Sequence, residues 1–137
     1  MKAIGLRRWS RNEYEAMIAA GLFAPGERVE LIDGEILTVT PQGSLHATAV
    51  RLAEDALRVS FGPGFDVRAQ LPLSCDAHSL PEPDLAVVSG QPRDFRDSHP
   101  ITAVLIVEIA DTTLEYDRQR KGRIYARAGI RDLPSQC

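Results

Sequence analysis

The chain has 137 residues, of which 44% are hydrophobic and 26% charged, and its formal net charge is −3. This size and composition are typical of one globular domain, so we expect residues 1–137 to form a single domain that does not coat nucleic acid through bulk charge. No apolar run approaches the ~18 residues that cross a bilayer, and only two cysteines occur, so we expect a protein of the reducing cytoplasm without a membrane anchor.

The first predicted elements are a short helix and a β-hairpin. Ser10 and Glu13 have the spacing of a capping box, and Gly21 is placed to end the helix that they begin. The dipeptide Asp33-Gly34 divides the apolar stretch VELIDGEILTV and favours the positive φ angles of a type I′ turn.

The middle of the chain predicts a helix and three strands. Apolar residues recur at helical spacing over about 44–60, which predicts a second helix packed on a sheet. Residues 65–71 alternate between apolar and polar types, as in a half-buried strand. PEPDLAVV at 81–88 begins with prolines that only a strand start or edge tolerates. After a polar loop over 89–100, residues 101–110 are nearly all apolar, as in a central strand covered on both faces.

A last helix is predicted over about 113–128. Six basic residues oppose Asp117 alone within residues 117–131, which gives this segment a net charge of +5 and leaves −8 for the rest. The basic segment could be a solvated helix face or a surface that contacts phosphate, and both interpretations stay open. The order of the elements predicts an α/β fold, an α+β sandwich with helices against a mixed sheet.

Two acidic residues stand out by their positions in predicted strands. Glu108 lies within ITAVLIVEIA, where an ionised carboxylate without a partner is strongly disfavoured. Asp84 begins the preceding strand, so the two acids can converge at one end of the sheet if the strands are neighbours. A divalent cation with oxygen ligands, Mg²⁺ or Mn²⁺, would keep both carboxylates ionised. The alternative is that Glu108 pairs with an arginine of the last helix and that Asp84 caps a turn.

Several motifs in this order carry a resemblance to a known family. PEPDLAVV is followed by VLIVEIAD and then by D-x-x-x-K-x-x-x-Y, at Asp117, Lys121 and Tyr125. With the hairpin VELIDGEI and the segment TPQGSLH, they resemble the signature of the Uma-two family of bacterial restriction endonucleases, in the PD-(D/E)XK nuclease superfamily. The likeness runs from about residue 9 to residue 130. It implies a restriction-endonuclease-like sheet flanked by helices, and an enzyme that hydrolyses DNA phosphodiester bonds with a divalent metal ion.

The resemblance also implies roles for individual residues. Asp84 and Glu108 would bind the metal ion, and Lys121 would orient or deprotonate the attacking water or stabilise the transition state. In the superfamily this lysine commonly lies two residues after the second acid, but position 110 is alanine here. The resemblance therefore implies that the lysine has moved to the next helix. Glu30 is a further candidate acid, and its alternative is a hairpin glutamate that faces solvent.

DNA is the partner that the resemblance implies. His46 is a candidate catalytic or phosphate-binding residue, and its alternative is an ordinary residue near a helix start. Arg120 and Arg123 lie on other faces of the last helix than Lys121, and we expect them to contact phosphates.

The C-terminal sequence RDLPSQC departs from the family pattern, in which an aromatic, apolar strand follows the last helix. We therefore expect the sheet to lack its final strand and the domain to be incomplete at its C-terminus. The unpaired edge would favour a homodimer or a higher homo-oligomer.

Two other classes of function compete with a nuclease. One is a catalytically inactive module that keeps the nuclease fold for binding or dimerisation. The other is a different two-carboxylate enzyme, such as a glycosidase, against which the 6% aromatic content argues because sugar platforms use aromatic rings.

Overall fold

The computed structural model describes residues 2–110 and 115–136, with side chains described for residues 2–109 and 118–131. Within these residues, the helices are α1 (Arg11–Ala19), α2 (Ser44–Phe61) and α3 (Glu115–Arg127), with a 3-10 turn at Pro92–Phe95. The strands are β1 (Val29–Ile32), β2 (Glu35–Thr38), β3 (Phe65–Ala69), β4 (Leu85–Ser89), β5 (Leu105–Ala110) and β6 (Asp132–Gln136).

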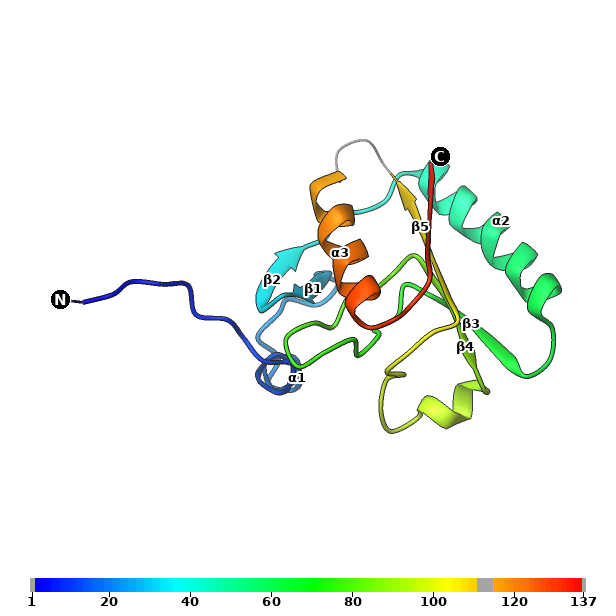
Figure 1. Cartoon of the computed structure of the whole chain (residues 1–137). Coiled ribbons are helices and arrows are strands. Elements are labelled where there is room, and N and C mark those ends of the chain that lie inside the picture. Colours follow the sequence, from blue (N-terminus) through cyan, green and yellow to red (C-terminus); the bar gives the residue numbers. More distant parts are fainter. Residues whose placement is uncertain (1, 111–114, 137) are drawn as a thin grey trace.

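The strands form two sheets. β1 and β2 pair as an antiparallel hairpin, while the larger sheet has the order β3-β4-β5-β6. Its pairs are antiparallel except for β5 and β6, which run parallel, so the predicted mixed sheet is confirmed. Helix α2 covers one face of this sheet and α3 covers the other, with the hairpin beside α3 (Figure 1).

The local sequence signals act as expected at α1 and at the hairpin. The Ser10 hydroxyl accepts a hydrogen bond from the backbone N–H of Glu13 at 3.1 Å, and the Glu13 carboxylate accepts one from the Ser10 N–H at 2.9 Å. At the hairpin turn, Asp33 and Gly34 have φ angles of 49° and 81°. Gly34 also lies against Arg8, whose Cβ would be only 2.5 Å from an added Cβ, so the position requires glycine.

Alternate residues of the central strands face two separate apolar cores. The core under α2 contains Val50, Val67, Leu85, Val87, Val107 and Ile109. The core on the α3 side contains Leu73, Ala86, Val88, Ala103, Ile106, Tyr125 and Ile130. Because β5 is covered on both faces, its apolar run carries no period-two pattern, and Glu108 falls on the α3 side with Ile106.

Two expectations about the strands are corrected. The strand predicted over 101–110 begins only at Leu105, because the preceding residues approach the sheet as a loop. The expected loss of the final strand is wrong: Asp132–Gln136 forms β6, with Ile106 opposite Asp132 and Ala110 opposite Gln136. Strand pairing uses backbone groups, so a segment without an apolar pattern can still extend a sheet at its edge, where even Pro134 is tolerated.

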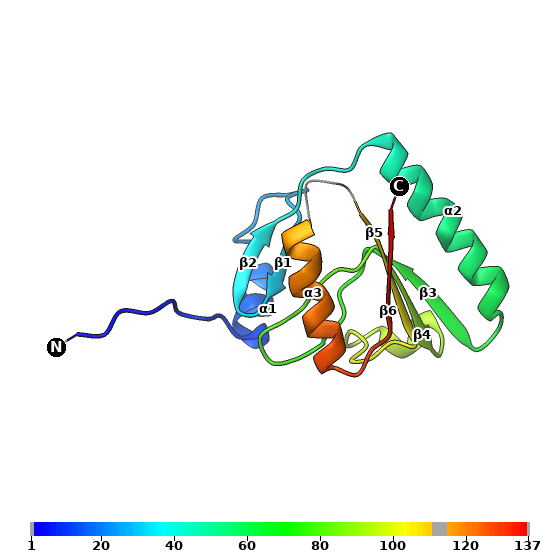
Figure 2. The same ribbon diagram turned by 45° about the horizontal axis from the view of Figure 1, so that its top comes forward.

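Figure 2 shows β6 alongside β5, at the edge of the sheet opposite β3. In the part of the chain that the structure describes, no helix has the length and apolar character needed to span a membrane.

The α1 cap gives a test of the fold. Ser10→Ala should lower the free energy of unfolding by about 1 kcal/mol, because it removes an N-cap acceptor and leaves a helix N–H without its bond. Urea denaturation measures this change. Ser60→Ala, at an exposed position in α2, is the control and should shift stability by less than ~0.5 kcal/mol. Equal effects of the two substitutions would contradict the capping role.

Candidate active site

Asp84 and Glu108 meet at one end of the large sheet. Leu85 pairs with Val107 in the antiparallel β4–β5 register, so one step further along the register aligns Asp84 with Glu108. The Asp84 backbone nitrogen lies 3.5 Å from Glu108 Oε2, and the Ile109 N–H donates to Asp84 Oδ2 at 2.8 Å. The expected convergence of the two acids is therefore found in the structure.

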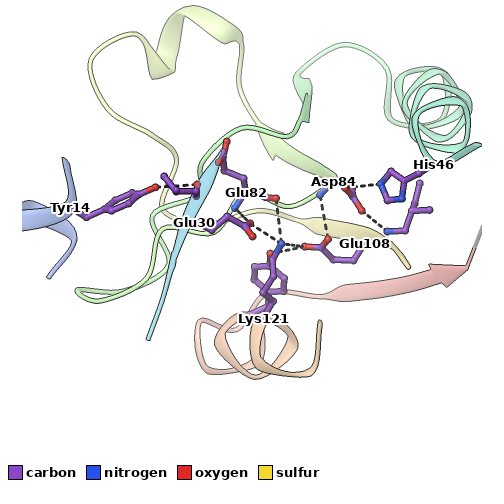
Figure 3. Close-up of polar contacts among 10 residues, drawn as sticks. Tyr14, Glu30, His46, Glu82, Asp84, Glu108 and Lys121 are labelled. Carbon is purple, nitrogen blue, oxygen red and sulfur yellow. Dashed lines mark hydrogen bonds and ion pairs between the residues drawn. The ribbon is translucent and has the colours of Figure 1, made fainter. Parts of the chain in front are cut away.

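Lys121 of α3 points into this cluster (Figure 3). Its Nζ lies 2.9 Å from Glu108 Oε1 and 3.0 Å from Glu30 Oε1. The backbone carbonyl of Glu82 is a third acceptor at 3.4 Å. The three hydrogens of the ammonium thus face three oxygen atoms, and only 10% of the side chain is exposed.

The pKa values of the pair follow from burial and from the neighbouring charges. Burial raises the pKa of Glu108 above its ordinary value; Lys121 opposes this shift, while Asp84 adds to it. Burial also disfavours the charged form of Lys121, but Glu108 and Glu30 outweigh it and raise the pKa of the ammonium. Lys121 is therefore positively charged at neutral pH.

Tyr125 completes the surroundings of Glu108. One turn beyond Lys121 on α3, its hydroxyl donates to Glu108 Oε1 at 2.9 Å. Burial and the nearby Glu108 carboxylate raise the pKa of Tyr125 well above its ordinary value, so the phenol stays a donor. Oε1 of Glu108 consequently accepts from two donors, whereas Oε2 faces Asp84.

Glu30 is part of the same cluster. It is 8% exposed, and its Oε1 accepts from the Glu82 N–H at 2.7 Å in addition to Lys121, so it does not face solvent. Glu82 contributes two backbone hydrogen bonds, which its residue type does not reveal, and its half-buried carboxyl group also lies near the charges of Glu30 and Lys121. The available signal was the pair of prolines around it, Pro81 and Pro83, which are fully buried and fix the approach to β4.

His46 joins the cluster from the first turn of α2. Its Nε2 lies 3.3 Å from Asp84 Oδ1, with a hydrogen position that depends on the tautomer. Both side chains are 13% exposed. Asp84 is thus held from two directions, by the imidazole at Oδ1 and by the Ile109 N–H at Oδ2.

The two candidate arginines differ in their surroundings. Arg120 is 11% exposed and contacts the hairpin, with Nη2 at 2.8 Å from Glu35 Oε2 and 3.3 Å from the Ile32 carbonyl. Arg123 is exposed. The side chain of Asp117, which belongs to the same sequence motif as Lys121, lies outside the described residues.

The donor set suits a hard divalent cation that keeps much of its water. Within residues 2–109 and 118–131, no group of three or more His, Cys, Asp or Glu side chains gathers to enclose a metal. Asp84 and Glu108 nevertheless offer carboxylate oxygens side by side, and Mg²⁺ is commonly bound through one or two carboxylates together with waters and substrate phosphate. Glu30 lies on the other side of Lys121, so the cluster brings three carboxyl groups around one ammonium.

The chain is similar to known proteins both in sequence and in structure. Residues 11–133 match the model of the Uma2 family, whose description is "Putative restriction endonuclease". The chain is also similar to the crystal structure of a "putative nuclease belonging to DUF820" from Anabaena variabilis, with a TM-score of 0.71 and 14% sequence identity, covering 93% of this chain and 73% of that one. At this identity the likeness shows the fold. No curated protein matches the chain.

The contacts of Lys121 predict how the stability of the folded protein depends on its ammonium group. Lys121→Met should lower the free energy of unfolding at pH 7 by roughly 3–5 kcal/mol, because Glu30 and Glu108 stay buried without their shared charge. Adding Glu108→Gln to this variant should restore part of the loss, since one uncompensated carboxylate is then removed. Urea denaturation of the three proteins decides it, and a Lys121→Met protein as stable as the unchanged chain would refute the interpretation.

Proposed function

The chain belongs to the Uma2 family, and from this premise we propose that it is a divalent-metal-dependent endonuclease that hydrolyses DNA phosphodiester bonds. The observation that carries the proposal is the convergence of Asp84 and Glu108 at one end of the large sheet, beside the buried ammonium of Lys121. Two carboxylates that lie side by side next to a fixed positive charge are an arrangement that suits a divalent cation and a phosphate group.

Asp84 and Glu108 are the proposed metal ligands. Bound there, Mg²⁺ or Mn²⁺ would lower the pKa of a water molecule and neutralise charge on the phosphate group. Oε2 of Glu108 suits this role because Lys121 and Tyr125 bond to Oε1. The hydrogen bond from the Ile109 N–H fixes the rotation of the Asp84 carboxylate.

Lys121 is proposed to act through its fixed positive charge. A general base must release its proton near the working pH, but the pKa of Lys121 is raised and its three hydrogens face bonded oxygens. The structure therefore supports stabilisation of a negatively charged transition state more than deprotonation of water. Glu30 is proposed to position the ammonium, since it holds Nζ from the side opposite Glu108.

His46 is proposed to orient Asp84 through their 3.3 Å contact. Arg123 is proposed to contact DNA phosphate, because it is exposed on the helix that carries Lys121. The guanidinium of Arg120 already bonds to Glu35 and to the Ile32 carbonyl, so it would have to bind a phosphate in addition to these groups. We therefore propose that Arg120 mainly holds the hairpin against α3.

Metal binding and DNA nicking test the proposal together. Calorimetry should give one Mn²⁺ per chain, and the protein should nick supercoiled plasmid with Mg²⁺ or Mn²⁺ but not with EDTA. Asp84→Asn should weaken Mn²⁺ binding at least ~10-fold and abolish nicking. The reason is that an ion held by two carboxylates keeps only one of them in this variant. Asp97→Asn, which changes an exposed acid, is the matched control and should do neither.

Lys121→Met separates binding from chemistry in the same assays. At a temperature where it remains folded, it should still bind Mn²⁺ but nick plasmid roughly 10²–10³-fold more slowly, the usual loss when one group that stabilises the transition state electrostatically is removed. A wild-type chain that binds no Mn²⁺ and nicks no DNA would reject the enzyme and favour an inactive binding module.

Arg123→Ala tests the DNA surface. If Arg123 contacts a phosphate, the variant should bind DNA of any sequence more weakly, and the slope of log affinity against log salt should fall by about 1. Fluorescence anisotropy over a range of salt concentrations measures both quantities. Arg93→Ala, at another exposed position, is the control, and an unchanged slope for Arg123→Ala would exclude the contact.

A further inference from the structure

The outer face of α2 exposes a regular apolar stripe. Leu45, Leu52 and Val59 are 73%, 67% and 85% exposed, and they recur every seven residues. Seven residues make nearly two helical turns, so the three side chains project from the same side. Val50 and its neighbours occupy the inner face against the sheet, and among the described residues no helix or strand lies over the outer face (Figure 2).

The two flanks of the stripe differ in chemistry. On one flank, Arg51 and Asp55 are exposed one turn apart. Among the described side chains, neither has an ion-pair partner, in contrast to the neighbouring Arg58, which bonds to Glu54 at 2.9 Å. On the other flank, Ala56 is exposed and small, while Ala49 already packs against the core under α2.

We propose that this face binds a second copy of the chain, with the two α2 helices antiparallel around a two-fold axis at Leu52. In this register Leu52 meets the partner's Leu52, and Leu45 meets the partner's Val59. A two-fold axis also brings the same flank of both helices together. Arg51 then lies about 3 Å along the helix axes from the partner's Asp55 and equally far from the partner's Arg51, so the flank combines two opposite-charge contacts with one like-charge contact.

The charges favour a second copy over other occupants. DNA-binding surfaces are strongly basic, whereas this face carries one arginine and one aspartate beside its apolar stripe. A helix that lies on a membrane carries mainly Lys and Arg on its polar side, but α2 also has Glu54 and Asp55 there. A flank that carries both Arg51 and Asp55 is matched by the same flank of a second copy, because the two-fold axis places each Arg51 near the partner's Asp55.

The proposed interface is small, so we expect the dimer to dissociate readily. One pair of 18-residue helices buries less than the ~1,600 Å² of a standard interface, so we expect dissociation constants in the micromolar range. His46 precedes Leu52 by six residues, which separates the two His46 Cα atoms by roughly 18 Å along the helix axes. The dimer would thus carry two candidate sites, a consequence that rests on the proposed function although the interface does not.

Sedimentation equilibrium without DNA tests the interface. The wild-type chain should reach a monomer–dimer equilibrium at micromolar concentration. Leu52→Asp should weaken it at least ~10-fold, because it opposes two like charges across the axis. Ile101→Asp, which changes another exposed apolar residue away from α2, should leave the equilibrium unchanged.

Charge reversal tests the register. Arg51→Asp and Asp55→Arg should each weaken the dimer, and the combined variant should restore it, because the swapped charges again face each other. A monomer at every concentration, or a dimer indifferent to these changes, overturns the proposal. So does a Leu52→Asp variant that loses DNA affinity without any change in mass. Mn²⁺ binding should be unchanged in all variants, so failure of the interface is distinguishable from failure of the metal site.

Discussion

The buried ammonium of Lys121, which lies between the carboxylates of Glu30 and Glu108, connects four segments of this protein. Lys121 draws its acceptors from β1, from the segment before β4 and from β5, and it is itself part of α3. The hairpin has its own small core around Tyr14 and Leu31, and the lysine cluster links it by charge to β5 of the large sheet. Buried charges stabilise only when every partner is in place, which makes these four segments mutually dependent.

The two carboxylate oxygens of Glu108 have different surroundings. Its Oε1 is bonded to the ammonium of Lys121 and the hydroxyl of Tyr125, while its Oε2 faces Asp84. Oε1 thus contributes to the fold, and Oε2 is the oxygen that the proposal assigns to a metal ion. This division explains how a glutamate in a covered strand can be both a stable core residue and a candidate ligand.

The sequence predicted this arrangement where side-chain pattern carries the information. Glu108 was conspicuous because a carboxylate interrupts an apolar strand. The structure places the ammonium of Lys121 beside it, as expected of a lysine that has moved to the last helix, whereas the expected divalent ion stays a prediction. Glu30 could not be resolved, because a hairpin residue can face either side until the hairpin is docked. The strand β6 and the two backbone groups of Glu82 were missed for one reason: main-chain hydrogen bonds leave no trace in residue type.

The separation of the cluster's members along the chain sets the order in which the site can form. Glu30 and Lys121 are 91 residues apart, and every acidic member precedes the lysine. During synthesis from the N-terminus, the hairpin and the strands emerge first, with acidic groups that have no cation to meet. A nascent chain therefore carries the acidic groups before the lysine that brings them together, and the cluster can form only after α3 has left the ribosome. Docking of α3 is thus the step in folding that completes the geometry of the candidate site.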